Sequence, residues 1–167
     1  ITERMAHDTH IKEILRDLFW KDAIIKSSKR KGADKIEESE KFKDYFEFEQ
    51  KISEIKKGKN SHRFLAMRRG MVLKVLKIEV SFDEERATRF IKTKFNIEDN
   101  LGAIDLLNRC TKRAYTNYIL SSLDLEVKSA LKKSADVQAI NIFSKNLKDL
   151  LLSPYLGSVR VLGVDPG

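Results

Sequence analysis

Closely spaced basic side chains are the residues in this sequence best suited to a chemical task. One group lies over residues 29–31 and another over residues 56–69. Lys and Arg at this density can neutralise the phosphates of a polyanion. The sequence therefore predicts a nucleic-acid-binding surface that comprises Arg63, Arg68, Arg69, Lys56, Lys57, Lys59, Lys29, Arg30 and Lys31.

Both basic groups also have a structural interpretation. Arg63 and Arg69 are six residues apart and fall on different faces of a helix, so we expect no continuous stripe and an ion pair for at least one of them. The first group, together with Lys26, is expected at the C-terminal end of a helix, where the helix dipole favours cations. Nucleic-acid binding and these structural roles would each explain why the basic residues are there.

Four aromatic residues stand among charged ones at Phe42, Tyr45, Phe46 and Phe48. Aromatic rings beside lysines can stack on unpaired bases. Such a cluster more often anchors a connecting segment to the core, because aromatic rings bury a large apolar area. We expect the anchoring role and keep base stacking as the alternative.

The remaining polar patterns do not complete a catalytic or metal site. His7, Asp8 and His10 have the composition of a metal site, but no fourth ligand is suitably spaced, and His62 lies beside the start of an expected helix. The sequence has no Ser-His-Asp arrangement, phosphate-binding loop or dinucleotide fingerprint. It therefore predicts no metal, no cofactor and no enzymatic activity.

The composition is that of a folded, helix-rich protein that attracts polyanions. Of 167 residues, 35% are charged and 41% hydrophobic, with 2 Pro, and 33 Lys and Arg against 25 Asp and Glu give a net charge of +8. The single Cys110 forms no internal disulfide, and the sequence has no membrane-spanning run or signal peptide. We expect a cytoplasmic protein without membrane contact.

The first part of the chain is expected to hold three helices and a strand. Apolar spacing predicts an amphipathic helix over 7–27 with Asp8 or Thr9 as N-cap, and then a short second helix after Gly32. Residues 41–55 read as an extended connection. Ser61 is expected to cap a short basic helix that Gly70 ends, and alternation over 71–82 predicts a strand.

The second part of the chain is expected to be mostly helical. Asp83 should cap a helix over 84–95, and another helix over 104–120 should end before Ser121 and Ser122. Ser121 and Asp124 resemble a capping box that starts a long helix over 123–152. β-branched residues over 159–164 predict a strand whose partners would follow in a longer chain.

These elements predict a mainly α fold: an irregular helical scaffold with one long central helix and a minor β element. We expect a helical region with a charged linker over 1–60, a basic helix with a strand and helices over 61–120, the long helix over 121–156, and the start of a further domain over 157–167. The chain begins without Met and ends after a strand without a partner, which is typical of a piece of a larger protein.

Three stretches resemble the Tex family of bacterial transcription accessory proteins: KFKDYFEFEQKISEI with SHRFLAMRRG shortly after it, AINIFSKNLKDLLLSPYLG, and VRVLGVDPG. The resemblance covers nearly the whole chain and departs from the family around KKGKN. It implies a long helix that carries several modules and an RNA-binding domain elsewhere in the protein. It also implies that the chain ends in the first strand of a YqgF-like, RNase H-like domain.

The resemblance also gives Asp165 a possible role. In RNase H-fold nucleases the first metal-binding carboxylate stands at a strand end, because two Mg²⁺ ions clamp the scissile phosphate. Asp165 in VLGVDPG matches that position, although one carboxylate cannot hold the metal pair and the others would follow Gly167.

We therefore expect a non-catalytic scaffold fragment of a nucleic-acid-binding transcription accessory protein. Its partners would be RNA or DNA, bound without sequence preference by the full-length protein, and the transcription machinery. Two alternatives stay open: the remnant of a metal-dependent nuclease or resolvase-like enzyme, and a helical module that only binds other proteins.

Overall fold

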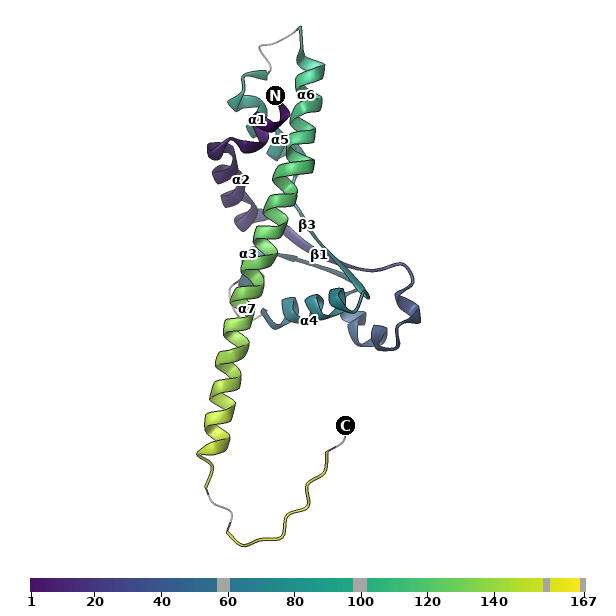
Figure 1. The fold of residues 1–167 in the computed structure, drawn as a ribbon, viewed down its shortest axis with the longest axis vertical. Helices are drawn as coiled ribbons and strands as arrows, with labels where there is room; N and C mark the ends of the chain where they lie inside the picture. The colour runs from purple at the N-terminus through teal and green to yellow at the C-terminus, as the bar shows by residue number, and fades with distance from the viewer. Residues whose placement is uncertain (57–60, 98–101, 155–156, 166–167) are drawn as a thin grey trace.

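One long helix organises the molecule, as the computed structural model shows (Figure 1). The structure describes residues 1–56, 61–97, 102–154 and 157–165. The N-terminal helices lie along the upper part of the long helix, and a small sheet with α4 projects to one side of its middle. The prediction of a mainly α fold with one long helix and a minor β element is confirmed.

The long helix consists of three consecutive parts. They are α6 (Ile104–Arg113, 10 residues), a π-helical segment η4 (Ala114–Ile119, 6 residues) and α7 (Leu120–Leu151, 32 residues). At about 1.5 Å per residue they extend roughly 70 Å.

The predicted break before Ser121 is wrong, as is the capping box. Ser121 and Ser122 are exposed within the continuous helix. The helix continues past them because Ile119, Leu123 and Val127 are buried on one side of it, and tertiary packing outweighs the low helix propensity of serine.

The N-terminal helices are α1 (Thr2–His7) and α2 (Thr9–Asp22). The carboxylate of Asp8 accepts a hydrogen bond from the backbone N–H of Ile11 at 2.9 Å, so Asp8 is the N-cap of α2. The predicted helix over 7–27 is too long, because α2 ends at Asp22 and Ile24–Lys29 forms strand β1. β1 has a paired strand on each side, and these long-range pairings outweigh its local helical pattern.

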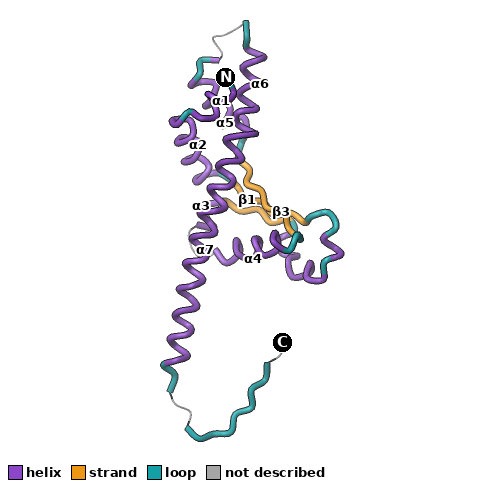
Figure 2. The backbone as a smooth tube through the Cα atoms, in the orientation of Figure 1, coloured by secondary structure: helices purple, strands orange, loops and turns teal. Residues whose placement is uncertain are grey.

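The sheet has the strand order β2-β1-β3, and both pairings are antiparallel. β2 is Glu47–Lys51 and β3 is Leu76–Ser81, which confirms the strand predicted within 71–82. Figure 2 shows the three strands beside the middle of the long helix. The segment between β1 and β2 contains two 3₁₀ helices, η1 (Ala33–Lys35) and η2 (Glu37–Tyr45).

The segment over 41–55, expected to be extended, is more regular than predicted. It contains the end of η2, the strand β2 and the start of the short helix α3 (Ile52–Lys56). The backbone N–H of Ile52 donates to the carbonyl of Ala23 at 3.0 Å, and Ile52 is buried. The segment is therefore an integral part of the sheet and the core.

Helix α4 (Ser61–Val72) passes through Gly70 instead of ending there. A Cβ atom on Gly70 would lie 2.7 Å from Cδ1 of Leu76 and 3.0 Å from Cδ1 of Phe42. Gly70 therefore allows a close approach of the helix to β3 and η2, and the prediction that it stops the helix is wrong.

Helix α5 (Glu84–Lys94) begins as predicted, because the carboxylate of Asp83 accepts a hydrogen bond from the N–H of Arg86 at 3.0 Å. One hydrophobic core joins these elements. Within it the rings of Phe19 on α2 and Phe82 are stacked with their centroids 4.8 Å apart. No helix in the described part of the chain is long and apolar enough to cross a membrane.

The strand predicted over 159–164 is not formed. Residues 157–165 have no regular secondary structure and run away from the end of α7 (Figure 1). Val161 and Leu162 are 76% and 89% exposed. A strand requires a pairing partner for its backbone groups, and no described strand pairs with this segment.

Candidate nucleic-acid interface

Part of each predicted basic group lies in one region of the molecule, which we call the side lobe: the end of β1, η1, η2, α4 and the turn into β3. The backbone N–H of Arg30 donates to the carbonyl of Val75 at 2.9 Å, and the N–H of Val75 donates to the carbonyl of Gly70 at 2.9 Å. These bonds place the basic turn at 29–31 beside the end of α4. The pairing of β1 with β3 thus joins groups that are distant in the sequence.

Lys29 is neutralised within the side lobe. Its amine donates a hydrogen bond to the carboxylate of Asp34 and lies 4.8 Å from the centroid of the Phe46 ring. The hydrogen bond from Lys29 and its charge hold the pKa of Asp34 below its ordinary value. The helix-dipole interpretation is wrong for this group, because Lys26 and Lys29 belong to β1, and Lys26 pairs across the sheet with Glu49 at 2.6 Å.

The arginines of α4 have different surroundings. The guanidinium of Arg63 lies 5.9 Å from the centroid of the Phe48 ring on β2. Arg69 lies 3.9 Å from a carboxylate oxygen of Glu38 on η2, and its side chain is 70% exposed. An exposed pair at that distance stabilises little, so Arg69 can still bind an external anion.

Six cations of the side lobe have no ion-pair partner among the described residues: Arg30, Lys31, Lys35, Arg63, Arg68 and Lys74. Lys74 was missed at the sequence level, because it looked like one charged position of an alternating strand. It occupies a turn with a φ of 61°, and its neighbour Val75 accepts the backbone hydrogen bond of Arg30. Only the strand pairing reveals this proximity.

The other predicted lysines stay predictions. Lys56 is the last residue of α3. Lys57 and Lys59 lie outside the described residues.

The aromatic residues of the side lobe anchor it. Phe42 is buried, and the rings of Tyr45 and Phe48 lie with their centroids 5.7 Å apart. Phe46, below the amine of Lys29, is half-buried and packs against the core. These contacts agree with the expected anchoring role.

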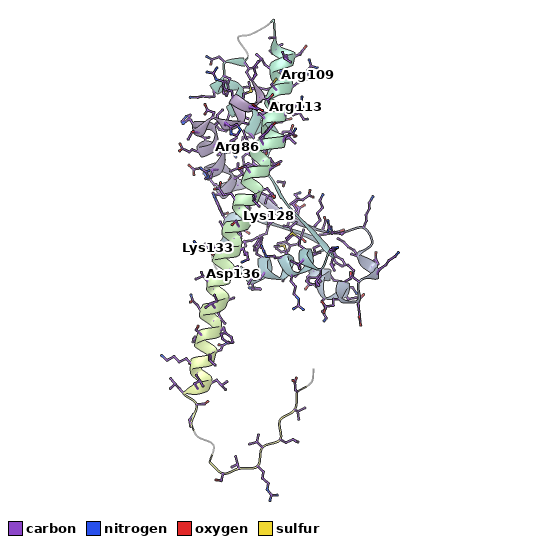
Figure 3. All side chains as sticks on the ribbon, viewed as in Figure 1. Arg86, Arg109, Arg113, Lys128, Lys133 and Asp136 are labelled. Carbon is purple, nitrogen blue, oxygen red and sulfur yellow. The ribbon has the colours of Figure 1, made fainter. Side chains whose placement is uncertain are left out.

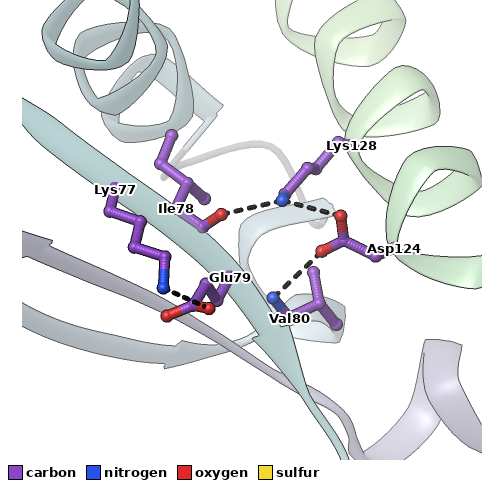
Figure 4. Close-up of polar contacts among 6 residues, drawn as sticks. All are labelled: Lys77, Ile78, Glu79, Val80, Asp124 and Lys128. Atoms are coloured by element: carbon purple, nitrogen blue, oxygen red, sulfur yellow. Dashed lines mark hydrogen bonds and ion pairs between the residues drawn. The ribbon is translucent and has the colours of Figure 1, made fainter. Parts of the chain in front are cut away.

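Two side chains of α7 attach the sheet to the long helix (Figure 4). The carboxylate of Asp124 accepts a hydrogen bond from the backbone N–H of Val80 at 3.1 Å. The amine of Lys128 donates to the carbonyl of Ile78 at 2.8 Å and to Asp124 at 2.7 Å. β3 is an edge strand, so these bonds satisfy backbone groups that would otherwise lack partners.

The candidate catalytic and metal residues do not converge. Asp165 is exposed in the irregular segment 157–165, and Asp8 is occupied as the N-cap of α2. The described ranges contain no group of three or more His, Cys, Asp or Glu residues placed to hold a metal ion. Cys110 is a free, half-buried thiol.

Comparison with known proteins places this arrangement in a family. The family described as Tex central region-like matches residues 1–143. The transcriptional accessory protein Tex of Neisseria gonorrhoeae is 34% identical over 100% of the chain and 22% of its own length. Protein YhgF of Escherichia coli K12 is 32% identical with the same coverage.

A more distant relative is the human S1 RNA-binding domain-containing protein 1. It is 26% identical over 100% of the chain and 17% of its own length. The chain thus spans about a fifth of the length of the curated relatives it matches. With a family match over residues 1–143 and relatives above 30% identity along its whole length, the chain belongs to the Tex family and corresponds to its central region.

Proposed function

We propose that this region is the helical scaffold of a nucleic-acid-binding transcription accessory protein, non-catalytic by itself, and that its side lobe contacts the phosphate backbone of RNA or DNA without sequence preference. The observation that carries the proposal is that the hydrogen bonds of Arg30 to Val75 and of Val75 to Gly70 bring the basic turn at 29–31 beside the C-terminal end of α4. Arg30, Lys31, Arg68 and Lys74 would supply the contacts.

The scaffold role is supported by the way the elements are attached to the long helix. Asp124 and Lys128 bond to the edge strand, and Leu123, Val127 and Leu131 are buried on the helix side that faces the rest of the fold. The position of the side lobe relative to the long helix is therefore determined by directional bonds and by packing. Such an attachment would hold neighbouring modules in a defined arrangement.

The names of the relatives support the proposed contact with nucleic acid. One relative is named a transcriptional accessory protein and another an S1 RNA-binding domain-containing protein. By extension, we propose the transcription machinery as a partner of the full-length protein, the cytoplasm as its location, and a YqgF-like, RNase H-like domain after residue 157.

The test is fluorescence anisotropy of the chain with labelled single-stranded RNA and double-stranded DNA across a salt series. Phosphate contacts release counterions, so the logarithm of the binding constant should fall linearly with the logarithm of salt concentration. The variant Arg30→Glu/Lys31→Glu should bind more weakly. Lys145→Glu/Lys148→Glu changes the charge equally on the exposed end of α7 and should bind like the parent. No saturable binding of the parent at low salt would refute the proposal.

A second candidate function, a module that binds other proteins, has one observation in its favour. Ile140, Phe143 and Leu150 on the last turns of α7 are 62%, 65% and 71% exposed. Ile140 follows Leu131 by nine residues, which at about 100° per residue turns it to the side opposite the buried face. This function predicts self-association that is insensitive to salt, without nucleic-acid affinity, as sedimentation velocity would show.

A further inference from the structure

We infer that a second surface, formed by α6 and α5 at the far end of the long helix, also binds the phosphodiester backbone of a nucleic acid. We call it the α6 face; its cations are Arg109, Lys112 and Arg113, with Arg89 and Lys92 beside them. The inference rests on the proposed function and adds a contact surface that the sequence patterns did not indicate.

The centre of the α6 face is one exposed side of α6. Arg109 and Arg113 are four residues apart, so their side chains are neighbours on the helix surface, and Figure 3 shows both on the upper part of the long helix. A shallow hollow of about 290 Å³ is lined by Arg109, Lys112, Arg113, Thr116 and Asn117. Three cationic and two neutral polar residues thus line one open surface.

Helix α5 extends the surface. Lys112 on α6 pairs with Glu84 on α5 at 3.2 Å, which shows that these two helix sides are adjacent. Glu84, Thr88 and Lys92 follow one another at four-residue spacing and so lie along that side of α5. Thr88, Lys92, Arg89 and Glu85 line a hollow of about 320 Å³.

Most cations of the α6 face make no ion pair, although Glu3, Glu84 and Glu85 lie near them. Within the described ranges, Arg89, Lys92 and Arg113 have no ion-pair partner, and Arg109 makes only a 3.4 Å hydrogen bond to the backbone carbonyl of Asp105. The pair of Lys112 is exposed on both sides, at 70% and 47%. Like charges at four-residue spacing repel each other, which a bound anion would relieve.

The fold does not need these cations for its own stability. The opposite side of the helix holds the buried residues Thr111, Ala114 and Tyr115, which pack into the core. Arg113 immediately precedes the π-helical segment, a feature that is frequent at functional sites, and this segment carries Thr116 and Asn117. A packed backbone therefore presents the charged side chains outward.

The chemistry of the surface fits phosphodiesters. Arginine side chains bind phosphate oxygens with two parallel hydrogen bonds, and hydroxyl and amide groups commonly donate to phosphates as well. The hollows are open and lie along a helix surface, which suits an extended polyanion better than an enclosed small molecule. RNA and DNA share this backbone chemistry, so the experiment includes both.

The decisive variant is Arg109→Ala/Arg113→Ala, measured by anisotropy with double-stranded DNA and single-stranded RNA over a salt series. The slope of log K against log salt should become shallower by about 0.9 per lost contact on duplex DNA and about 0.7 on single strands. This corresponds to roughly tenfold weaker binding per contact near 50 mM salt. Lys133→Ala/Lys145→Ala removes the same charge from exposed positions of α7 and should keep the parent slope.

Conservative replacement separates charge from geometry. Arg109→Lys/Arg113→Lys keeps the charge and should keep the slope, but it should bind more weakly because an ammonium group cannot make the paired hydrogen bonds. Thermal melting of each variant checks the fold. If the double alanine variant does not fold, Arg113→Ala alone tests the loss of charge through the slope, and the lysine variant tests the paired hydrogen bonds through the affinity.

The outcomes separate the two proposals. If Arg30→Glu/Lys31→Glu weakens binding and Arg109→Ala/Arg113→Ala does not, the α6 face is refuted and the proposed function stands. If the parent binds neither nucleic acid, both are refuted. Equal affinity for polyglutamate and for nucleic acid would also overturn the inference, because it would show attraction to any polyanion.

Discussion

The carboxylate of Asp124 joins the long helix to the sheet by accepting a hydrogen bond from the backbone N–H of Val80 at 3.1 Å. Its second oxygen accepts from Lys128, whose amine also bonds to the carbonyl of Ile78. The side chain of Lys128 is 21% exposed and that of Asp124 29% exposed, so both groups are partly withdrawn from water. One carboxylate therefore serves a backbone donor and a lysine together.

Removing this carboxylate should destabilise the fold. Asp124→Ala leaves the N–H of Val80 and part of the Lys128 amine without partners, and the free energy of unfolding should fall by about 1–3 kcal/mol. Urea denaturation measures the change. Asp149→Ala, an exposed position near the end of the same helix, is the control and should change it by less than about 0.5 kcal/mol. Equal effects for the two variants would contradict the role of Asp124.

Gly70→Ala tests whether the glycine serves packing. Helix propensity alone predicts that alanine stabilises α4 by about 1 kcal/mol. The contact of the new Cβ with Leu76 at 2.7 Å predicts the opposite, a loss of about 1–3 kcal/mol through overpacking. The sign of the change in the free energy of unfolding decides between the two. Gly102→Ala, where a Cβ would meet nothing within 4 Å, is the control.

The same substitution at two leucines of α7 should have very different effects. Leu131 is 2% exposed and Leu150 is 71% exposed. Leu131→Ala should lower the free energy of unfolding by about 2–5 kcal/mol, because it leaves a cavity in the core. Leu150→Ala should change it by less than about 0.5 kcal/mol. A large decrease in the free energy of unfolding for Leu150→Ala, in protein that sedimentation shows to be monomeric, would show that the last turns of α7 are packed within the chain.

Tyr115 should make the fold sensitive to alkaline pH. Burial raises the pKa of its hydroxyl to about 12, and the nearby Glu84 and Asp83 act in the same direction. In the unfolded chain the pKa of this hydroxyl is about 10. Its contribution to the free energy of unfolding is therefore complete below pH 10 and is lost as pH rises from about 10 to 12. Chemical denaturation at stepped pH should show this loss.

Tyr115→Phe should abolish that part of the alkaline loss. The hydroxyl is buried and has no hydrogen-bond partner among the described residues. Its removal should therefore leave stability at neutral pH unchanged or slightly higher, because a desolvated polar group is eliminated. Tyr118→Phe, on an exposed side chain, is the matched control and should leave the alkaline profile intact.

Some features of this protein follow from the sequence alone. Asp8 and Asp83 could be recognised as N-caps because each carboxylate bonds to a backbone N–H only three residues ahead. β3 was recognisable because apolar and charged residues alternate along it. The helix-rich composition and the apolar stripe of α7 predicted the architecture. All of these signals lie within a few neighbouring residues.

Other features were decided by contacts between distant segments. Residues 24–27 continue a helical apolar pattern, yet they form a central strand because β2 and β3 pair with them on both sides. Asp124 looked like a capping residue and instead bonds to the sheet. Lys74 lies beside the turn that contains Arg30 only because of the bond between Arg30 and Val75.

The difference between these two kinds of feature reflects how far apart in the sequence the interacting residues are. A helix cap pairs backbone groups, and an alternating strand buries every second side chain, within a few residues of the sequence. Both can therefore be recognised from adjacent positions. Strand pairing, the close approach at Gly70 and the positions of the cations depend on which distant backbone groups become partners on folding. Composition and local spacing thus determined the helix-rich class of the fold and its local caps, while the tertiary structure decided which charges are neutralised and which face solvent.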